Sequence, residues 1–355
     1  MRIGIVNDRP VAVEVLRRIV TGPAGCEVAW IAENGREAVA LCRRDLPDLV
    51  LMDLLMPVLD GVEATRRIMA VAPCPILVVT ATVDGNTTRV YDALGAGALD
   101  AVDTPCLGPD GNLESAEPLL KKIRTIARLI RAEPCGDASA PAPAWSPAAP
   151  VAYSEPTRRR TLVAIASSTG GPEALATLLQ GLPDDFSPPI VIVQHLGASF
   201  LDGFVTWLQG QTGRPVRAAR SGARPTPEAV LVAAGDEHVV LDAGQALAFT
   251  PEPRRRPYRP SADVFFHSLA SHSAAPGVAV VLTGMGRDGA QGLLELRRAG
   301  WSTLAQDRAS SVVYGMPRAA AEADAAEHVV GIGQMGPAIA RAWQTPVPTT
   351  KDRPR

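Results

Sequence analysis

Short apolar runs alternate with amphipathic segments along the first 130 residues. Five of the runs have the length of buried strands: 2–6, 28–32, 49–52, 76–79 and 98–102. Segments with helical spacing lie between and after them: 11–20, 35–44, 61–70, 87–94 and 119–130. Five strands that alternate with helices predict a doubly wound α/β domain with a five-stranded parallel sheet.

The pattern breaks after this domain. Residues from about 133 to 157 combine repeated prolines and many alanines with few large apolar side chains, which predicts a semi-extended linker. The arginines at 158–160 are interpreted as a solvated entrance to the next domain. We therefore expect a first domain over residues 1–130, a linker over 131–157, and a larger α/β domain with a mainly parallel sheet over 158–345.

In the second domain, three apolar runs each end in a residue that can take part in hydrolysis. Ser168 follows the run 162–166, His195 follows the run 190–193, and Asp288 follows the run 278–282. Sites in open α/β sheets form at the carboxyl ends of strands, and activated-serine chemistry needs a nucleophile, a general base and an orienting acid. Taken singly, the three residues are more simply a turn serine, a structural histidine and a turn aspartate. Their joint placement at three strand ends favours a serine hydrolase.

Polar residues also follow the strands of the first domain. Asp8 comes after the first predicted strand, Asp53 after the third and Thr80 after the fourth, and these strand ends cluster in a doubly wound fold. Clustered carboxylates with a hydroxyl can hold Mg²⁺, and a carboxylate at such a site can accept a phosphoryl group. For any one of these aspartates alone, a helix cap is the simpler interpretation.

Composition narrows the choice of partner and compartment. A chain of 355 residues suggests two domains, and a formal net charge of −2 gives no pull toward nucleic acid or a membrane surface. The five cysteines are dispersed without metal-ligand spacing, which indicates reduced thiols in a cytoplasm. The chain opens directly on a strand pattern and has no apolar stretch of transmembrane length. We therefore expect a cytoplasmic protein with no membrane insertion.

Several motifs together carry a resemblance to a known family. In the first domain they are DLLMPVLDG at 53–61 and TA at 80–81; in the second they are ASSTGG at 166–171, QH at 194–195, YRPSAD at 258–263, LTGMGRDG at 282–289 and SSVVYGMP at 310–317. This set resembles CheB-type chemotaxis response regulators, in which a receiver domain is joined to a protein-glutamate methylesterase. The segments IVND at 5–8 and LDAVDTP at 99–105 are most similar to the CheB-like member of Wsp-type surface-sensing systems, whose output is a diguanylate cyclase.

The resemblance implies roles for residues of the second domain. Ser168 would be the nucleophile, His195 the general base and Asp288 the residue that orients the imidazole, with Thr169 and the backbone of Met285 near the oxyanion. The implied reaction is hydrolysis of glutamate γ-methyl esters on chemoreceptor helices with release of methanol, and glutamine deamidation is a second activity of the family. The ester chemistry requires no cofactor.

The resemblance also implies phosphorylation of the first domain. Asp53 would receive a phosphoryl group from a CheA-type histidine kinase, with Thr80 as the switch hydroxyl. Mg²⁺ would be held by Asp8, Asp53 and the backbone of Leu55. The unphosphorylated receiver would cover the catalytic residues until phosphorylation shifts the population toward an open state.

Three positions depart from the receiver pattern. Asn7 stands where an acidic residue is usual, Thr104 where a lysine contacts the phosphoryl group, and Ala101 at the aromatic switch position. A carboxamide brings no charge, so cation affinity should fall. Two interpretations stay open: a switch that still accepts phosphate on Asp53, and a degenerate receiver with a constitutive esterase.

Rival functions come from other classes. A non-catalytic adaptor that only binds receptors conflicts with the complete set of candidate catalytic residues, and an esterase for small metabolites leaves the receiver unexplained. A DNA-binding response regulator would need a basic recognition helix, which the sequence lacks.

Overall fold

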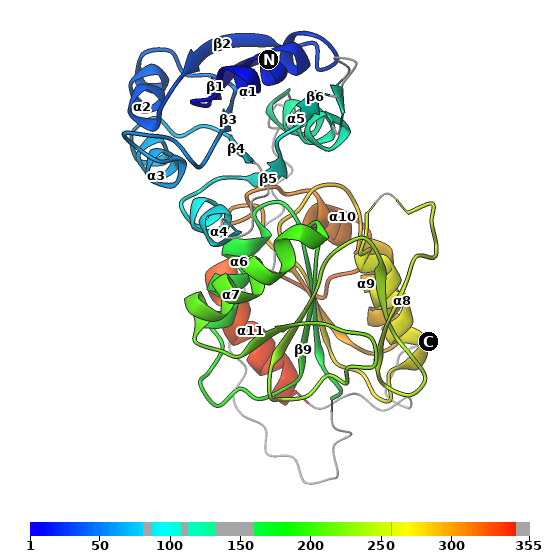
Figure 1. Cartoon of the computed structure of the whole chain (residues 1–355). Helices are drawn as coiled ribbons and strands as arrows, with labels where there is room; N and C mark the ends of the chain where they lie inside the picture. The colour runs from blue at the N-terminus through cyan, green and yellow to red at the C-terminus, as the bar shows by residue number, and fades with distance from the viewer. Residues whose placement is uncertain (81–86, 108–112, 115, 132–159, 257, 346–355) are drawn as a thin grey trace. The chain divides into compact units, whose positions relative to one another are not determined.

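The computed structural model describes the chain except for residues 81–86, 108–112, 115, 132–159, 257 and 346–355 (Figure 1). The predicted linker over 131–157 therefore falls almost wholly outside the described residues. The chain divides into two compact units, one built on a five-stranded sheet and the other on a seven-stranded sheet.

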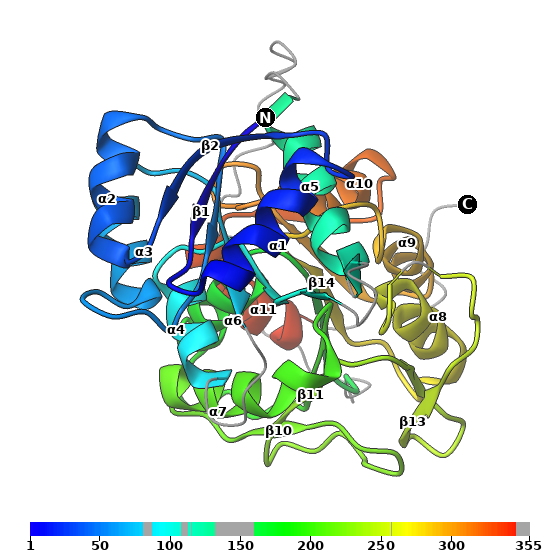
Figure 2. The ribbon, with the colours of Figure 1, turned by 45° about the horizontal axis from the view of Figure 1, so that its top comes forward.

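The first unit is the predicted doubly wound domain. Its strands are β1 (Arg2–Val6), β2 (Glu27–Ala32), β3 (Leu49–Met52), β4 (Ile76–Thr80) and β5 (Asp100–Asp103), all paired in parallel in the order β2-β1-β3-β4-β5. Helices α1 (Pro10–Thr21) and α5 (Ala116–Arg131) share a core with one face of the sheet, and α2 (Gly35–Arg44), α3 (Gly61–Val71) and α4 (Thr87–Gly95) lie over the other (Figure 2). The predicted five-stranded parallel sheet is confirmed.

Several element ends of this unit differ from the sequence-based expectation by one to three residues, and one short ribbon is additional. The fifth strand begins at Asp100 and not at Ala98, because the Ala98 N–H donates to the Ala93 carbonyl and belongs to the closing turn of α4. A short antiparallel ribbon, β6 (Cys106–Leu107) and β7 (Leu113–Glu114), was not predicted.

The start of α3 fixes the loop that carries Asp53. The Asp60 side chain caps this helix by accepting from the Glu63 N–H at 2.9 Å. Gly61 packs so closely that a Cβ there would lie 2.1 Å from the Asp53 carbonyl oxygen. Only glycine allows that approach, so α3 and the end of β3 are held together.

The second unit is a larger parallel α/β domain. Its sheet contains β8 (Val163–Ser167), β9 (Ile190–Gln194), β10 (Val216–Ala218), β11 (Val230–Ala233), β14 (Val278–Val281), β15 (Ser302–Gln306) and β16 (His328–Val330). Helices α6 (Gly171–Gln180), α7 (Leu201–Thr212) and α11 (Ile332–Gln344) lie on one side, and α8 (Ala262–His272), α9 (Ala290–Arg298) and α10 (Met316–Glu322) lie on the other (Figure 1). A hairpin of β12 (His238–Leu241) and β13 (Leu247–Thr250) packs on α8.

The strand order locates the site of this domain. The order is β10-β11-β9-β8-β14-β15-β16 with every pair parallel, so the chain builds outward from β8 in one direction and then returns to β8's other side at β14. The reversal between β8 and β14 is a topological switch point, where helices diverge to opposite faces and leave a crevice. Ser168 and Asp288 follow the two strands that flank this point.

Arg160 corrects one expectation at the domain entrance. Its side chain is buried and not solvated; its guanidinium donates to the carbonyls of Gly277 at 2.7 Å and Thr345 at 3.1 Å, and to Ser302 Oγ at 3.1 Å. Three carbonyl and hydroxyl oxygens therefore offset much of the cost of burying the charge. Arg160 fastens the start of the domain to its last helix.

Candidate active site

Ser168 lies in the tight turn that joins β8 to α6. Its N–H donates to the Thr283 carbonyl at 3.1 Å, and its own carbonyl accepts from Gly171 N at 2.8 Å and Gln194 Nε2 at 2.9 Å. Gly170 precedes the helix with a φ of 74°, a conformation that favours glycine. The turn thus holds the serine at a helix amino terminus, where backbone N–H groups and the helix dipole favour negative charge.

The surroundings of Ser168 are packed too closely for larger side chains. A Cβ at Gly284 would lie 2.7 Å from the Ser168 Cβ, and a Cβ at Gly171 would lie 2.4 Å from Gln194 Oε1. Gln194 Oε1 in turn accepts from Ser167 Oγ at 2.5 Å. The glycines therefore allow the Gln194 amide to brace the serine turn from the neighbouring strand.

His195 and Asp288 form a buried pair. His195 Nε2 lies 2.9 Å from Asp288 Oδ2, and the two side chains are 8% and 5% exposed. The His195 N–H donates to the Ser167 carbonyl at 3.1 Å, and Ser167 pairs with Gln194 in the register of β8 and β9. His195 thus follows the strand next to the one that Ser168 follows.

The free nitrogen of His195 defines its chemistry. Nδ1 is buried and has no hydrogen-bond partner among the residues that the structure describes. Because the proton on Nε2 is donated in the hydrogen bond to Asp288, Nδ1 of the neutral imidazole carries a lone pair that can accept a proton. Across the described residues, no hydrogen bond joins Ser168 Oγ to His195, and such contacts often tighten only when substrate is bound.

Asp288 is held as an anion by donors at the start of α8. Ser261 Oγ donates to Oδ1 at 2.7 Å, the Ala262 N–H to Oδ2 at 2.6 Å and the Asp263 N–H to Oδ1 at 3.3 Å. Burial alone would raise the pKa of Asp288, but the hydrogen bonds from His195, Ser261 and Ala262 outweigh it, so the pKa lies below its ordinary value. Asp288 is therefore ionised at neutral pH and orients the imidazole.

The two residues expected near the oxyanion lie beside the serine turn. Thr169 is buried, and its carbonyl accepts from Thr283 Oγ1 at 3.0 Å. Met285 is half-buried and follows Gly284, whose backbone packs against Ser168. Thr283 also accepts from the Val313 N–H at 2.9 Å, so one side chain joins three loops at this edge of the sheet.

Several residues of this site were not assigned a role from the sequence. Gln194, Tyr258 and Ser261 fall in segments singled out as motifs, but no strand or helix pattern points to their contacts. Tyr258 stacks on His195, and Ser261 caps α8 by accepting from the Val264 N–H. For Ser261, its place directly before an apolar helix is a sequence signal for a helix cap.

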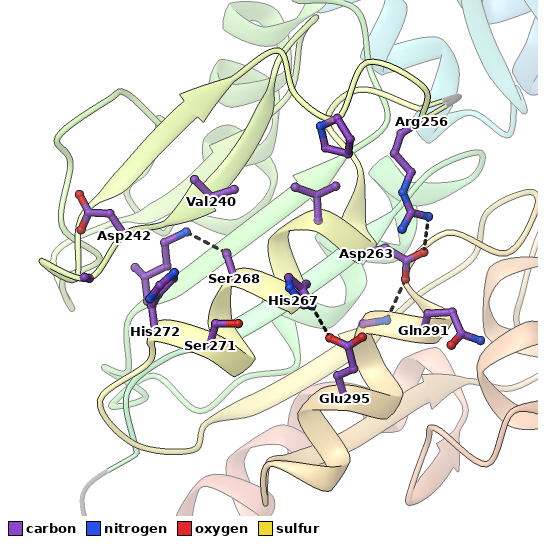
Figure 3. A pocket seen from close by; sticks show the side chains of 15 residues that line it. Val240, Asp242, Arg256, Asp263, His267, Ser268, Ser271, His272, Gln291 and Glu295 are labelled. Atoms are coloured by element: carbon purple, nitrogen blue, oxygen red, sulfur yellow. Dashed lines mark hydrogen bonds and ion pairs between the residues drawn. The ribbon is translucent and has the colours of Figure 1, made fainter.

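A separate cavity lies between the β12–β13 hairpin and helices α8 and α9 (Figure 3). It has a volume of about 680 Å³, and its lining includes the Arg256–Asp263 ion pair at 3.2 Å and the His267–Glu295 pair at 2.6 Å. None of the three candidate catalytic residues lines it. The cavity is therefore distinct from the serine site.

The receiver site centres on Asp53. Its Oδ2 accepts from Asn7 Nδ2 at 2.9 Å, and its Oδ1 accepts from the N–H groups of Leu54 at 2.7 Å and Leu55 at 3.4 Å. Burial raises the pKa of Asp53, which the two backbone N–H groups partly oppose. Asp8 is exposed beside it, so two carboxylates and one carboxamide make up the acidic site.

The residues expected to transmit phosphorylation lie at the end of β4, within β5 and directly after β5. Thr80 is buried, and its carbonyl accepts from the Thr104 N–H at 3.0 Å. Ala101 is buried in β5 and leaves no aromatic ring at the switch position. Across the part of the chain that the structure describes, no three histidine, cysteine or acidic side chains cluster as a metal site.

The geometry defines a class before any comparison. A serine, a histidine and a buried aspartate at neighbouring strand ends of a parallel α/β sheet form the arrangement of a serine hydrolase, here joined to a receiver-like domain. The protein-family comparison agrees: residues 163–339 match the CheB methylesterase model and residues 3–110 match the response regulator receiver domain model.

Whole-chain relatives extend this match. The chain is 53% identical over 346 residues to a protein-glutamate methylesterase/protein-glutamine glutaminase of Mesorhizobium japonicum, covering 97% of this chain and 99% of the relative. It is 53% identical over 329 residues to the enzyme of that name from the group 3 operon of Pseudomonas putida, covering 93% of this chain and 95% of that relative.

Among solved structures, the catalytic domain of the Thermotoga maritima CheB methylesterase is 30% identical, with 52% of this chain and 99% of that one covered and a TM-score of 0.49.

The chain belongs to the CheB family of protein-glutamate methylesterases/protein-glutamine glutaminases. It is a methylesterase/glutaminase of chemotaxis adaptation that carries a response-regulator receiver domain. The predicted family, enzyme class and fold are thus confirmed. No helix among the described residues has the length and apolar character needed to cross a bilayer.

Proposed function

We propose that Ser168, His195 and Asp288 form the catalytic triad for hydrolysis of glutamate γ-methyl esters on chemoreceptor helices. The observation that carries the proposal is the buried His195–Asp288 hydrogen bond, which leaves His195 Nδ1 without a hydrogen-bond partner among the described residues. A neutral imidazole with a free lone pair is the general base that a serine nucleophile needs.

The reaction then proceeds in two halves. Ser168 Oγ attacks the ester carbonyl while His195 Nδ1 takes the hydroxyl proton, and His195 returns that proton to the departing methoxide, which leaves as methanol. Water attacks the acyl-enzyme with His195 again as base, which frees the glutamate carboxylate and restores Ser168. Glutamine deamidation follows the same path with ammonia as the leaving group.

The oxyanion of each tetrahedral intermediate lies close to the start of α6. Thr169 and the backbone of Met285 are the groups that we assign to its stabilisation, because both belong to loops that pack on Ser168. Preorganised donors in such a place contribute about 3–4 kcal/mol each to the transition state.

We propose that Asp53 accepts phosphate from a CheA-type histidine kinase and that this relieves inhibition by the receiver. The oxygens of Asp8, Asp53 and the Leu55 carbonyl fit a hard cation such as Mg²⁺, which supplies charge neutralisation for phosphoryl transfer when bound. The fit is incomplete, because Asn7 points its amide donor at Asp53 and its amide oxygen accepts from the Arg9 N–H at 2.9 Å.

A second candidate, a constitutive esterase with a degenerate receiver, is favoured by this same observation. The Asn7 amide donates to Asp53 Oδ2 at 2.9 Å and brings no negative charge to the site. Thr104 and Ala101 replace the lysine and the aromatic ring that couple phosphorylation to conformation in the family pattern. Phosphodonor dependence separates this candidate from the switch.

We also propose a pathway and a location for the protein. We place the protein in a Wsp-type system because its segments at 5–8 and 99–105 resemble those of such systems, and a Pseudomonas putida relative is named for a group 3 operon. The free cysteines Cys26, Cys42 and Cys74 support a cytoplasmic location. Receptor helices and the kinase are the expected partners, and no nucleic acid is.

Methanol release from methylated receptor membranes, with and without a phosphodonor, tests the function. The full chain should release methanol and should be faster with the phosphodonor. We place the esterase domain at residues 158–345, and this fragment should exceed the unphosphorylated full chain. Absence of methanol release from the chain and from the fragment would leave the receptor-binding adaptor; equal rates in all arms would leave the constitutive enzyme.

A further inference from the structure

We infer that Tyr258 is a positioning residue of this hydrolase, which holds the imidazole of His195 in its productive plane. The inference rests on the triad proposed above. It concerns a residue for which the reaction chemistry itself gives no role, since the phenol is neither the nucleophile nor the base nor the orienting acid.

The two rings are stacked with nearly parallel planes. Their centroids lie 4.5 Å apart and their planes differ by 3°. One edge of the His195 ring is fixed by the hydrogen bond from Nε2 to Asp288, but a single bond leaves the ring free to rock about that contact. The phenol of Tyr258 closes one face of the imidazole and removes this freedom.

Tyr258 belongs to a short segment that also donates hydrogen bonds to Asp288, the partner of His195. Three and four residues later, Ser261 Oγ and the Ala262 N–H donate to the Asp288 carboxylate. The Ser261 N–H donates to Nδ1 of the buried His238 at 3.0 Å. Burial lowers the pKa of His238, which keeps Nδ1 available as an acceptor. One short segment therefore sets both the ring plane and the carboxylate.

Two further contacts hold the segment, an ion pair between residues at its two ends and the packing of the Tyr258 hydroxyl against a neighbouring loop. Arg256 pairs with Asp263 at 3.2 Å, and Asp263 accepts from the Gly292 N–H at 2.9 Å (Figure 3). A Cβ at Gly286 would lie 2.8 Å from Tyr258 Oη, so the phenol end lies against the loop that also contains Met285. Tyr258 thus joins the base to the loop that we assign to the oxyanion.

The stack has a consequence for the transition state. When His195 Nδ1 takes the serine proton, the imidazole becomes a cation in a buried site. The face of an aromatic ring attracts a cation within about 6 Å of its centroid, so the phenol stabilises the charge that forms during the reaction. An aliphatic side chain of similar size would fill the space but supply neither the flat face nor this attraction.

The test compares Tyr258→Phe with Tyr258→Leu in the full chain. Tyr258→Phe keeps the ring and should retain kcat within about threefold, whereas Tyr258→Leu should lower kcat about tenfold with KM little changed. Phe249→Leu is the matched control, because it removes another partly buried aromatic ring that packs on the core of the same domain. It should lower thermal stability without lowering kcat.

A spectroscopic readout separates positioning from mere packing. The ring current of a stacked phenol shifts the carbon-bound imidazole protons of His195 upfield, and these signals, assigned by their loss in His195→Gln, should stay upfield in Tyr258→Phe and move downfield in Tyr258→Leu. The Tyr258→Leu loss should also shrink in an Asp288→Asn background, because both residues act through His195.

The outcomes distinguish this inference from the proposed function. If Tyr258→Leu keeps the wild-type kcat, or if Tyr258→Phe loses as much as Tyr258→Leu, the positioning role is wrong. If Ser168→Ala retains methanol release, the proposed triad fails first. Loss of activity in Ser168→Ala together with full activity in Tyr258→Leu overturns the role of Tyr258 alone.

Discussion

The esterase site and the receiver site each place one buried aspartate at the carboxyl ends of parallel strands, yet they treat it differently. Asp288 accepts from the His195 imidazole, a hydroxyl and backbone N–H groups, and its pKa is lowered despite burial. Asp53 accepts from one carboxamide and two backbone N–H groups, and burial raises its pKa. The donors around Asp288 keep its carboxylate ionised, whereas those around Asp53 stabilise its ionised form less.

This difference matches two kinds of work. An orienting carboxylate is most useful when it stays ionised and immobile through every step. A carboxylate that accepts a phosphoryl group has to act as a nucleophile, and strong hydrogen-bond donors on all of its lone pairs would lower its nucleophilicity. The comparison predicts that changes at the esterase site act on chemistry, while changes at the receiver site act on metal affinity and regulation.

The largest expected effect is at the nucleophile. Ser168→Ala should lower methanol release by several orders of magnitude, as loss of a triad member does in serine hydrolases. Phosphodonor labelling of Asp53 and the unfolding temperature should stay at wild-type values, since the hydrogen bonds described for Ser168 are made by its backbone. A variant that keeps the wild-type rate ends the assignment of Ser168.

The next effect is expected at the support of Asp288. Ser261→Ala removes the hydroxyl that donates at 2.7 Å, and a hydrogen bond to a charged group is worth about 1.5–3 kcal/mol. We expect kcat/KM to fall about tenfold or more, with Ser261→Thr restoring most of it. Equal losses in the alanine and threonine variants would show that the hydroxyl is not what supports Asp288.

At the receiver, Asn7→Asp should reverse the balance at Asp53. The change replaces the amide donor at 2.9 Å by a second carboxylate, so like charges repel unless a cation joins them. The unfolding temperature should drop without Mg²⁺ and recover with it, and Mg²⁺ affinity should rise about tenfold. Asn7→Ser is the neutral control; a Mg²⁺ response identical to that of Asn7→Asp would show that charge is not the cause.

The smallest effect concerns coupling. Thr104→Lys supplies a cation that can contact phosphoryl oxygens, and should strengthen phosphodonor activation of the esterase by a few-fold. Asp53→Asn has to be measured in parallel, because a lysine could alter the receiver without phosphate. If the gain in esterase activity from Thr104→Lys persists when Asp53→Asn is also present, the lysine acts without phosphate. If phosphodonor labelling persists in Asp53→Asn, Asp53 is not the switch.

The sequence predicts those parts of the molecule that local pattern controls. The helix 35–44 and the strand 49–52 were predicted to the residue, because the Asn34 cap and an unbroken apolar run mark their ends. The three strand ends of the esterase followed from the same logic. The stack of Tyr258, the amide orientation of Asn7 and the buried Arg160 could not be predicted, since each depends on contacts between segments far apart in the chain.

Arg160 also has a practical consequence for the topology of the esterase domain. Its guanidinium bonds to Gly277 and Ser302, at the amino ends of β14 and β15, and to Thr345 after the last helix. The beginning and the end of the domain therefore meet within the reach of one side chain, at the edge of the sheet opposite Ser168. Domains whose ends lie close together tolerate circular permutation. A short peptide could therefore join these two ends, with new termini in the β12–β13 turn. The order of the elements along the chain would change, while the strand ends that carry Ser168, His195 and Asp288 would stay as they are.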